Sequence, residues 1–181
     1  MRTGNKKMPE SLEIKMIVTD VDGVLTDGGI YVDQDGRRSR RFCVRDGFAF
    51  EMARCVGLLT AIVSGKNSPG VRSRAEELGI SDCLLGIRDK LPAVEGLAEK
   101  HNVSLAEICY VGDDLNDLNV LEVVGFAVAV PNAPDELKKV SDYVCKNSGG
   151  DGAFREAVEN VLRNMGLYSI AIAKLTGSAG V

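Results

Sequence analysis

Short apolar, β-branched runs alternate with amphipathic segments along nearly the whole sequence. Most of these runs are continuously apolar, as strands are when helices cover both faces of their sheet. Alternation of this kind indicates parallel strands joined by crossover helices. The sequence therefore predicts an α/β fold, a Rossmann-like doubly wound parallel sheet. The expected strands are residues 14–19, 59–63, 83–85, 108–111, 126–130 and 143–145.

The segments between these runs carry apolar residues at helical spacing. Phe154, Val158, Val161 and Leu162, for example, fall at positions i, i+4, i+7 and i+8. Such spacing places the apolar side chains on one face, which packs against the sheet. We expect helices over about residues 48–56, 71–78, 91–98 and 154–162, with Gly79 ending the second of them.

One segment breaks the alternation directly after the first expected strand. Residues 29–32 and 37–42 flank the turn sequence Asp33-Gln-Asp-Gly36, which predicts an inserted β-hairpin. Its second arm holds Arg37, Arg38, Arg40 and Arg41. We expect these arginines either to form a solvated arm or to act between subunits.

Composition and charge exclude several classes of protein. With 181 residues, 45% hydrophobic and 27% charged, the chain has the make-up of one soluble globular domain. A net charge of −4 argues against a protein whose main task is to hold nucleic acid. Five scattered cysteines without a C-x-x-C pair fit neither a zinc site nor a disulfide framework, so reduced core residues are expected.

The ends of the chain are expected to lie outside the main domain. We divide the chain into an N-terminal extension (residues 1–13), the main domain (14–165) and a C-terminal tail (166–181). The first 12 residues lack the apolar stretch of a secretory signal, and no 18-residue apolar run exists. The predicted location is the cytoplasm, without a membrane partner. The tail is expected either to fray or to reach a neighbouring subunit.

Two acidic clusters follow apolar strands. Asp20 and Asp22 come after the first strand, and Asp113, Asp114 and Asp117 come after the run at 108–111. The carboxyl ends of parallel strands are where such sheets bind ligands. Carboxylates gathered there repel one another unless a cation lies among them, and magnesium prefers oxygen ligands. The alternative is that each cluster only caps a helix or fills a turn.

Ser64, Gly65 and Lys90 stand where a bound phosphate would need donors. Ser64 and Gly65 end the second apolar strand, so the hydroxyl and the Gly65 amide could both donate to phosphoryl oxygens. Lys90 opens a helix, where a cation runs against the helix dipole, so a local reason for it is expected. The alternative for Ser64 and Gly65 is an ordinary turn.

Taken together, these motifs resemble those of the haloacid dehalogenase superfamily. The resemblance covers about residues 14–165. Further features are similar to its capless branch, which contains 3-deoxy-D-manno-octulosonate 8-phosphate phosphatase, 2-keto-3-deoxynononate 9-phosphate phosphatase and the carboxy-terminal domain of animal acylneuraminate cytidylyltransferase. The superfamily motifs are Asp20-x-Asp-Gly-Val, Ser64-Gly, Lys90 and Gly112-Asp-Asp-x-x-Asp117, and the branch features are the hairpin, Val44-Arg-Asp-Gly47 and Gly149-Gly-x-Gly-x-x-Arg155.

The resemblance implies catalytic roles. Asp20 is expected to be the nucleophile that takes the phosphoryl group as an aspartyl-phosphate, and Asp22 the general acid and base. Magnesium is expected on Asp20, the Asp22 backbone carbonyl and Asp113, with Asp114 and Asp117 in support. Ser64 and Lys90 are expected to bind the phosphoryl oxygens.

The resemblance also implies a sugar-acid phosphate as the substrate. Lys66 and the Val-Arg-Asp-Gly sequence favour the octulosonate phosphatase, whereas Lys66 and Glu77 depart from the nononate phosphatase. Glu51 departs from the octulosonate pattern, in which an arginine is expected. The residues expected to bind substrate are Asp22, Cys43, Val44, Arg45, Asp46, Gly47, Gly65, Lys66, Arg74 and Lys90. For Arg74 the alternative is a plain surface residue of a helix.

The expected function is thus magnesium-dependent hydrolysis of a sugar-acid phosphate, with 3-deoxy-D-manno-octulosonate 8-phosphate as first choice. The alternatives are the nononate 9-phosphate phosphatase, a noncatalytic assembly domain and a receiver-like signalling domain. An assembly domain would have eroded motifs, and a receiver would lack Asp22. Because 181 residues leave no room for a cap domain, the resemblance implies a homotetramer in which hairpins pack together and cover neighbouring active sites.

Overall fold

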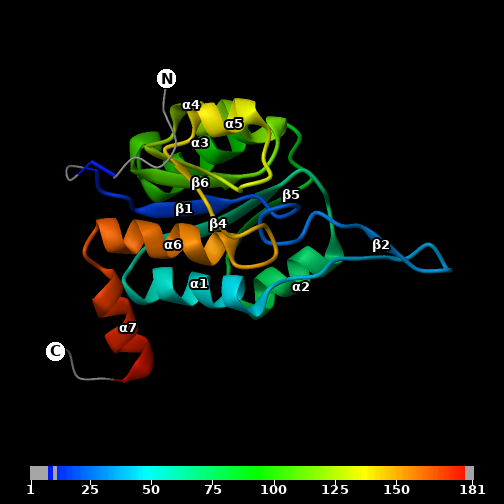
Figure 1. Cartoon of the computed structure of the whole chain (residues 1–181), viewed down its shortest axis with the longest axis horizontal. Coiled ribbons are helices and arrows are strands. Elements are labelled where there is room, and N and C mark those ends of the chain that lie inside the picture. The colour runs from blue at the N-terminus through cyan, green and yellow to red at the C-terminus, as the bar shows by residue number, and fades with distance from the viewer. Residues whose placement is uncertain (1–7, 10–11, 178–181) are drawn as a thin grey trace.

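The computed structural model describes residues 8–9 and 12–177 as three layers, with helices on both faces of one parallel sheet (Figure 1). The strand order is β5-β4-β1-β6-β7-β8, and every neighbouring pair is parallel. This confirms the predicted α/β class. The strands of the sheet are β1 (Met16–Thr19), β4 (Leu59–Ser64), β5 (Asp82–Leu85), β6 (Ile108–Gly112), β7 (Phe126–Ala129) and β8 (Tyr143–Val144).

Two groups of helices cover the sheet. One face carries α1 (Val44–Cys55), α2 (Pro69–Glu77) and α6 (Ala153–Asn164), and the other carries α3 (Lys90–His101), α4 (Leu118–Val123) and α5 (Asp135–Val140) (Figure 1). Two 3₁₀ turns, η1 (Leu105–Glu107) and η2 (Leu115–Asp117), precede β6 and α4.

The apolar pattern of the strands determines where the core lies. All four residues of β1 and of β7 are buried, because each strand has helices over both faces. Phe50 of α1 and Phe154 of α6 pack with their ring centroids 4.4 Å apart and join the helices of one layer. In the sheet β1 lies between β4 and β6. The chain runs from β1 to β4 and β5 on one side and then crosses over to β6 on the other, so the sheet has its switch point at the carboxyl end of β1.

The hairpin that follows β1 projects from the body of the molecule (Figure 1). Its strands β2 (Tyr31–Val32) and β3 (Arg38–Ser39) pair antiparallel, and a bridge between Thr26 and Phe42 closes its base. In the described part of the chain it is the only insertion between β1 and β4, and no cap domain is present there.

The C-terminal segment differs from the frayed end that we considered. Residues Tyr168–Thr176 form α7, which packs beside α1 with Ala171 fully buried. Lys174 Nζ donates to the carbonyl of Cys55, the last residue of α1, at 2.9 Å. Residues 178–181, and residues 1–7 and 10–11 of the N-terminal extension, lie outside the described residues, so what the sequence predicts for them stays a prediction.

Candidate active site

The two acidic clusters meet at the carboxyl end of the sheet. Thr19 of β1 pairs with Val111 of β6, and the Asp20 amide donates to the Val111 carbonyl at 3.0 Å. Asp20 and Asp113, which follow these strands, are therefore brought side by side. Oxygens of Asp20, Asp113 and Asp117 all lie within 4.8 Å of one another.

Lys90 holds this acidic cluster together from the first turn of α3. Its ammonium lies 3.0 Å from Asp20 Oδ2 and 2.6 Å from Asp117 Oδ1, and its side chain is fully buried. Asp117 Oδ1 also accepts a hydrogen bond from the hydroxyl of Tyr110, at 2.6 Å. A positive charge at the start of a helix is unfavourable because of the helix dipole. The two buried carboxylates that Lys90 contacts are the local reason for it.

Burial and mutual repulsion oppose the ionisation of two of these carboxyl groups. Burial raises the pKa of Asp20 to about 6, and the charge of Asp117 adds to the rise. Burial, followed by the charges of Asp20 and Asp117, raises the pKa of Asp113 to about 8. Burial disfavours the charge of Lys90, but Asp117 and Asp20 outweigh it and raise the Lys90 pKa.

The cluster fits a hard divalent cation. Asp20 Oδ1 is buried and has no hydrogen-bond donor among the described residues. Asp117 is engaged with Lys90, Tyr110 and the Asp113 amide, so Asp20 and Asp113 are the carboxylates left to face an ion. One or two carboxylates with further oxygens from backbone and water are the ligands that magnesium takes.

Glycines let the loop after β1 approach this cluster. Gly23 has φ +91°, and a Cβ there would lie 1.9 Å from Asp113 Oδ2. Behind the loop, a Cβ on Gly149 would lie 1.8 Å from the Gly23 carbonyl oxygen, and the Gly150 amide donates to the Val24 carbonyl at 2.9 Å. The glycine pair after β8 therefore supports the loop that carries Asp22.

Asp22 does not join the buried cluster but faces the hairpin. Arg40 binds its carboxylate with two nitrogens: Nε lies 2.5 Å from Oδ1 and Nη2 lies 3.1 Å from Oδ2. Arg40 Nη1 also donates to Ser68 Oγ at 3.1 Å. The expectation of a wholly solvated arginine arm is therefore wrong for Arg40, because the hairpin folds back towards its own chain at this point.

The residues at the end of β4 lie beside the motif of β1. Thr19 pairs with Ile62, so Ser64 stands next to residues 20–22 at the same edge. Ser64 is almost fully buried, Gly65 is half-buried and Lys66 is exposed. The Ser64 carbonyl accepts from the Ile87 amide, which ties this edge to the turn before α3.

The residues at the start of α1 have separate partners within the protein. Asp46 is buried, and its two oxygens accept from the amides of Gly152 (3.2 Å) and Arg155 (2.8 Å) at the start of α6. Arg45 pairs with Asp151 at 2.7 Å, and Val44 is 81% exposed. The contacts of Asp46 are those of a helix cap, a role that the sequence did not indicate.

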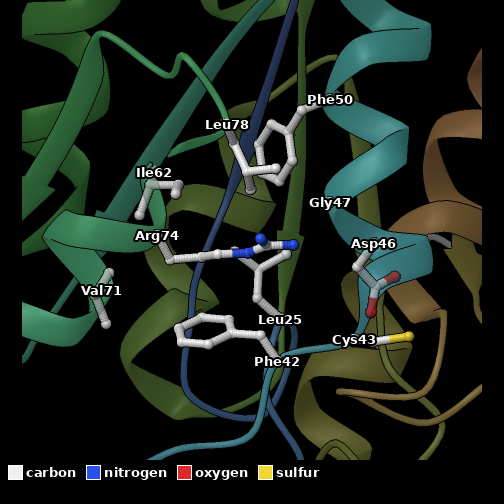
Figure 2. A pocket seen from close by; sticks show the side chains of 10 residues that line it. All are labelled: Leu25, Phe42, Cys43, Asp46, Gly47, Phe50, Ile62, Val71, Arg74 and Leu78. Carbon is white, nitrogen blue, oxygen red and sulfur yellow. The ribbon is translucent and has the colours of Figure 1, made fainter. Parts of the chain in front are cut away.

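Arg74 lies in a pocket between α1 and α2. Figure 2 shows its guanidinium reaching towards Gly47, between Phe50 and Leu25, while the Cys43 sulfur points away. A Cβ on Gly47 would lie 2.4 Å from Arg74 Nη2, so the glycine makes room for the guanidinium. Arg74 also forms an ion pair with Glu77 at 2.7 Å.

A groove of about 510 Å³ connects Arg74 with Arg40. It runs between the hairpin and α2, and its wall includes hydroxyl side chains, three arginines and one carboxylate. These polar residues are Ser39, Ser68, Ser73, Arg38, Arg40, Arg74 and Glu77. Of the residues predicted to bind substrate, Arg74 lines this groove. Arg40, which also lines it, binds the Asp22 carboxylate.

Two residues of the site, Ser68 and Tyr110, were not singled out from the sequence, and Arg40 was named only as one of the hairpin arginines. Arg40 and Ser68 are polar residues in loops, where nothing in the pattern shows that they meet. Tyr110 gave a weak signal, since a tyrosine in an otherwise apolar, buried strand needs a partner for its hydroxyl.

Comparisons with known proteins place this geometry among phosphatases. The sequence profile of haloacid dehalogenase-like hydrolases matches residues 85–156. The chain is 38% identical to the 3-deoxy-D-manno-octulosonate 8-phosphate phosphatase of Haemophilus influenzae over 164 residues, 90% of this chain and 91% of that protein. It is 39% identical to the enzyme of the same name from Escherichia coli K12 over 153 residues, 84% of this chain and 81% of that protein.

Solved structures agree with these sequence matches. The 3-deoxy-D-manno-octulosonate 8-phosphate phosphatase of Moraxella catarrhalis, in complex with magnesium ion, phosphate ion and KDO, superposes with a TM-score of 0.87 at 38% identity, covering 92% of this chain and 95% of that one. The cobalt-bound Haemophilus influenzae enzyme gives a TM-score of 0.84 at 37% identity, covering 89% and 94%.

Proposed function

The chain belongs to the 3-deoxy-D-manno-octulosonate 8-phosphate phosphatases of the haloacid dehalogenase superfamily, and from this membership we propose that it is a magnesium-dependent phosphatase that hydrolyses 3-deoxy-D-manno-octulosonate 8-phosphate through an aspartyl-phosphate. The observation that carries the proposal is the pairing of Asp20 with the buried Lys90 beside Asp113 at the carboxyl end of β1.

The residues at the site support a two-step reaction. A carboxylate oxygen of Asp20 attacks phosphorus, the bond from phosphorus to the sugar oxygen breaks, and Asp22 protonates the departing alkoxide. Asp22 then takes a proton from a water molecule, whose oxygen attacks the aspartyl-phosphate and releases inorganic phosphate. Lys90 and Ser64 bind phosphoryl oxygens, where charge needs stabilisation in the transition state.

Asp20, Asp113 and the Asp22 backbone carbonyl are the groups that would hold magnesium, with Asp114 and Asp117 in support. When bound, the ion offsets the repulsion between the Asp20 carboxylate and the phosphate dianion. The unsatisfied Asp20 Oδ1 supports this assignment, because a buried carboxylate oxygen without a donor is costly unless a cation is near it.

Cationic and backbone donors beside the site support a substrate that carries a carboxylate. Lys66 and Gly65 follow Ser64, and Arg74 lies along the groove that leads to Asp22. We assign the recognition of the sugar acid to these residues and to the segment from Cys43 to Gly47, of which Asp46 also caps α6.

A panel of phosphate monoesters tests the assignment. With Mg²⁺, the 8-phosphate should be hydrolysed with a higher kcat/KM than 2-keto-3-deoxynononate 9-phosphate, and both with a higher value than a neutral hexose phosphate. Lys66→Glu should reduce that preference, and EDTA should abolish turnover reversibly. If the hexose phosphate is the best substrate, recognition of a carboxylate is wrong.

Two variants test the chemistry. Asp20→Asn should abolish turnover while the chain stays folded, because an amide is not a competent nucleophile. Asp22→Asn should slow turnover by roughly 10² to 10⁴-fold, the usual worth of general acid-base catalysis. Wild-type rates in either variant would remove the residue from its role.

The physiological setting follows from the substrate. Hydrolysis of a sugar-acid phosphate in the cytoplasm would supply the free octulosonate for lipopolysaccharide synthesis. Among the described residues, no helix has both the length and the apolar character that crossing a bilayer requires. The assembly that we propose is a homotetramer of this chain, with a small-molecule substrate and no nucleic-acid partner.

A further inference from the structure

We propose that Arg40 is a positioning residue for Asp22, which it holds from the hairpin of the same chain. This inference rests on the proposed function, because it takes Asp22 as the general acid that protonates the leaving alkoxide. It gives a specific role in the site to a residue that the sequence indicates only as one of the hairpin arginines.

The contact between Arg40 and Asp22 is a two-point contact. Nε and Nη2 of one planar guanidinium lie 2.5 and 3.1 Å from the two oxygens of one carboxylate. Such a fork fixes the plane of the carboxylate as well as its distance, whereas a lysine would fix only the distance. Among the described residues, only Arg40 forms a side-chain hydrogen bond with the Asp22 carboxylate, and the Asp22 side chain is 36% exposed.

Ser68 anchors the other side of the guanidinium. It stands at the N-cap of α2, where a serine hydroxyl usually accepts a bond from the first turn, yet it makes no such cap bond. Its oxygen accepts from Arg40 Nη1 at 3.1 Å, and Ser68 is only 8% exposed. Arg40 is therefore held between two elements of the body of the molecule.

Burial separates Arg40 from the other arginines of its arm. The Arg40 side chain is 16% exposed, against 56% for Arg41 and 80% for Arg37. Two residues after Arg40, Phe42 bridges to Thr26 in the loop that carries Asp22. The base of the hairpin is thus fastened to that loop, which limits how far the guanidinium can drift from the carboxylate.

Fixing the carboxylate matters because proton transfer depends on geometry. A misplacement of about 1 Å at a reacting group can cost roughly 10²-fold in rate. A half-exposed aspartate without Arg40 would sample several rotamers, of which only some point at the leaving oxygen. Loss of Arg40 should therefore slow both steps in which Asp22 transfers a proton, and kcat/KM reports the first of them, the protonation of the leaving alkoxide.

The test compares substrates with poor and good leaving groups. For Arg40→Ala, kcat/KM should fall about 10 to 100-fold with the octulosonate 8-phosphate, whose alkoxide needs a proton. With p-nitrophenyl phosphate, whose leaving group departs unprotonated, kcat/KM should fall by less than about 3-fold. An equal fall with both substrates would overturn the inference.

Combination with Asp22→Asn separates positioning from substrate binding. If Arg40 acts through Asp22, adding Arg40→Ala to Asp22→Asn should cost less than about 2-fold more, since effects within one unit are not additive. Full additivity would overturn the inference. Ser68→Ala, which removes one anchor, should show the pattern of Arg40→Ala with a smaller loss, and Arg40→Lys should recover part of the rate.

Arg41→Ala is the matched control, because Arg41 is the next residue and pairs with Asp27 rather than Asp22. It should leave both values of kcat/KM within about 2-fold of wild type, and circular dichroism should show all variants folded.

If the wild type does not hydrolyse the octulosonate phosphate but does hydrolyse another alkyl phosphate, the proposed substrate fails, and that ester tests Arg40 in its place.

Discussion

At the scale of single residues, the site concentrates negative charge where the sheet excludes water. Asp20 and Asp113 lie beside Asp117, and only the buried ammonium of Lys90 offsets their charge in the described protein. The carboxylates of the phosphatase site thus destabilise the folded state by repelling one another, and a bound cation should offset that repulsion.

The stability of the metal-free protein should therefore fall as pH rises. The pKa values of Asp20, about 6, and Asp113, about 8, lie above those of the unfolded chain, so the folded state keeps its protons to higher pH. The contribution of these two groups to stability is then full at low pH, below their unfolded pKa values, and is lost as pH rises through their folded values. Thermal unfolding in EDTA should show a lower Tm at pH 8 than at pH 5.

Magnesium should raise the Tm more at pH 8 than at pH 5, because it binds the ionised carboxylates of the folded state. Asp20→Asn should weaken both trends, and Asp35→Asn, an exposed carboxylate of the hairpin, should change neither. A metal-free Tm that rises between pH 5 and pH 8 would contradict this account.

Gly23 should be intolerant of any side chain. Its Cβ would lie 1.9 Å from Asp113 Oδ2, whereas Gly36 in the hairpin turn has a similar positive φ and nothing within 4 Å of its Cβ. Gly36→Ala should cost only the backbone strain, about 1–2 kcal/mol. Gly23→Ala should cost more in urea unfolding and also weaken magnesium binding, measured by titration. Equal effects of the two substitutions would exclude a specific role for the space beside Asp113.

At the scale of elements, the strand carrying each motif was easier to predict than the contacts its motif makes. Apolar runs predict all six strands of the sheet. The pattern is strongest in β1, β6 and β7, which are wholly buried, whereas the edge strands β5 and β8 are largely half-buried. The helices α4 and α5, six residues each, are too short for helical periodicity to stand out. Helix α7 was missed because its apolar residues are spread among small ones and only Ala171 is buried.

The residues of the site divide in the same way, into those that a local sequence pattern marks and those that only the fold brings together. Asp20, Ser64, Lys90 and Asp113 were found because each stands at the end of a strand or the start of a helix. Arg40 and Ser68 were not, because their contact joins a hairpin to a helix terminus about 28 residues away, and no local pattern reports such a contact.

Asp46 provides an element-scale prediction that separates a cap from a substrate ligand. Asp46→Ala should leave the amides of Gly152 and Arg155 at the start of α6 without their acceptor, at a cost of about 1–3 kcal/mol in urea unfolding. Asp151→Ala, which removes only the exposed pair with Arg45, should cost less than about 1 kcal/mol. A raised KM with unchanged stability in Asp46→Ala would instead make Asp46 a substrate residue.

At the scale of the whole molecule, the hairpin has two different surfaces. Near its base, Arg40 is held against the body of its own chain. On the β2 arm, Ile30 and Val32 are each 61% exposed and Tyr31 is 48% exposed. A two-stranded hairpin with an apolar arm in water is marginally stable, and its edge is open to a partner. The base can therefore serve its own site while the arm contacts another subunit.

This arrangement sharpens the prediction of a homotetramer. Sedimentation of the wild type should give a tetramer, and the double substitution of Ile30→Ser with Val32→Ser should dissociate it, because these side chains lose the apolar surface that a second copy would cover. The double variant keeps Arg40 and Asp22, so any loss of turnover it shows comes from assembly. Replacing residues 30–41 with a short Gly-Ser link removes both surfaces and should lose more activity than dissociation alone. A monomeric wild type, or a dissociated double variant with undiminished turnover of the sugar-acid phosphate, would show that the active site is complete within one chain.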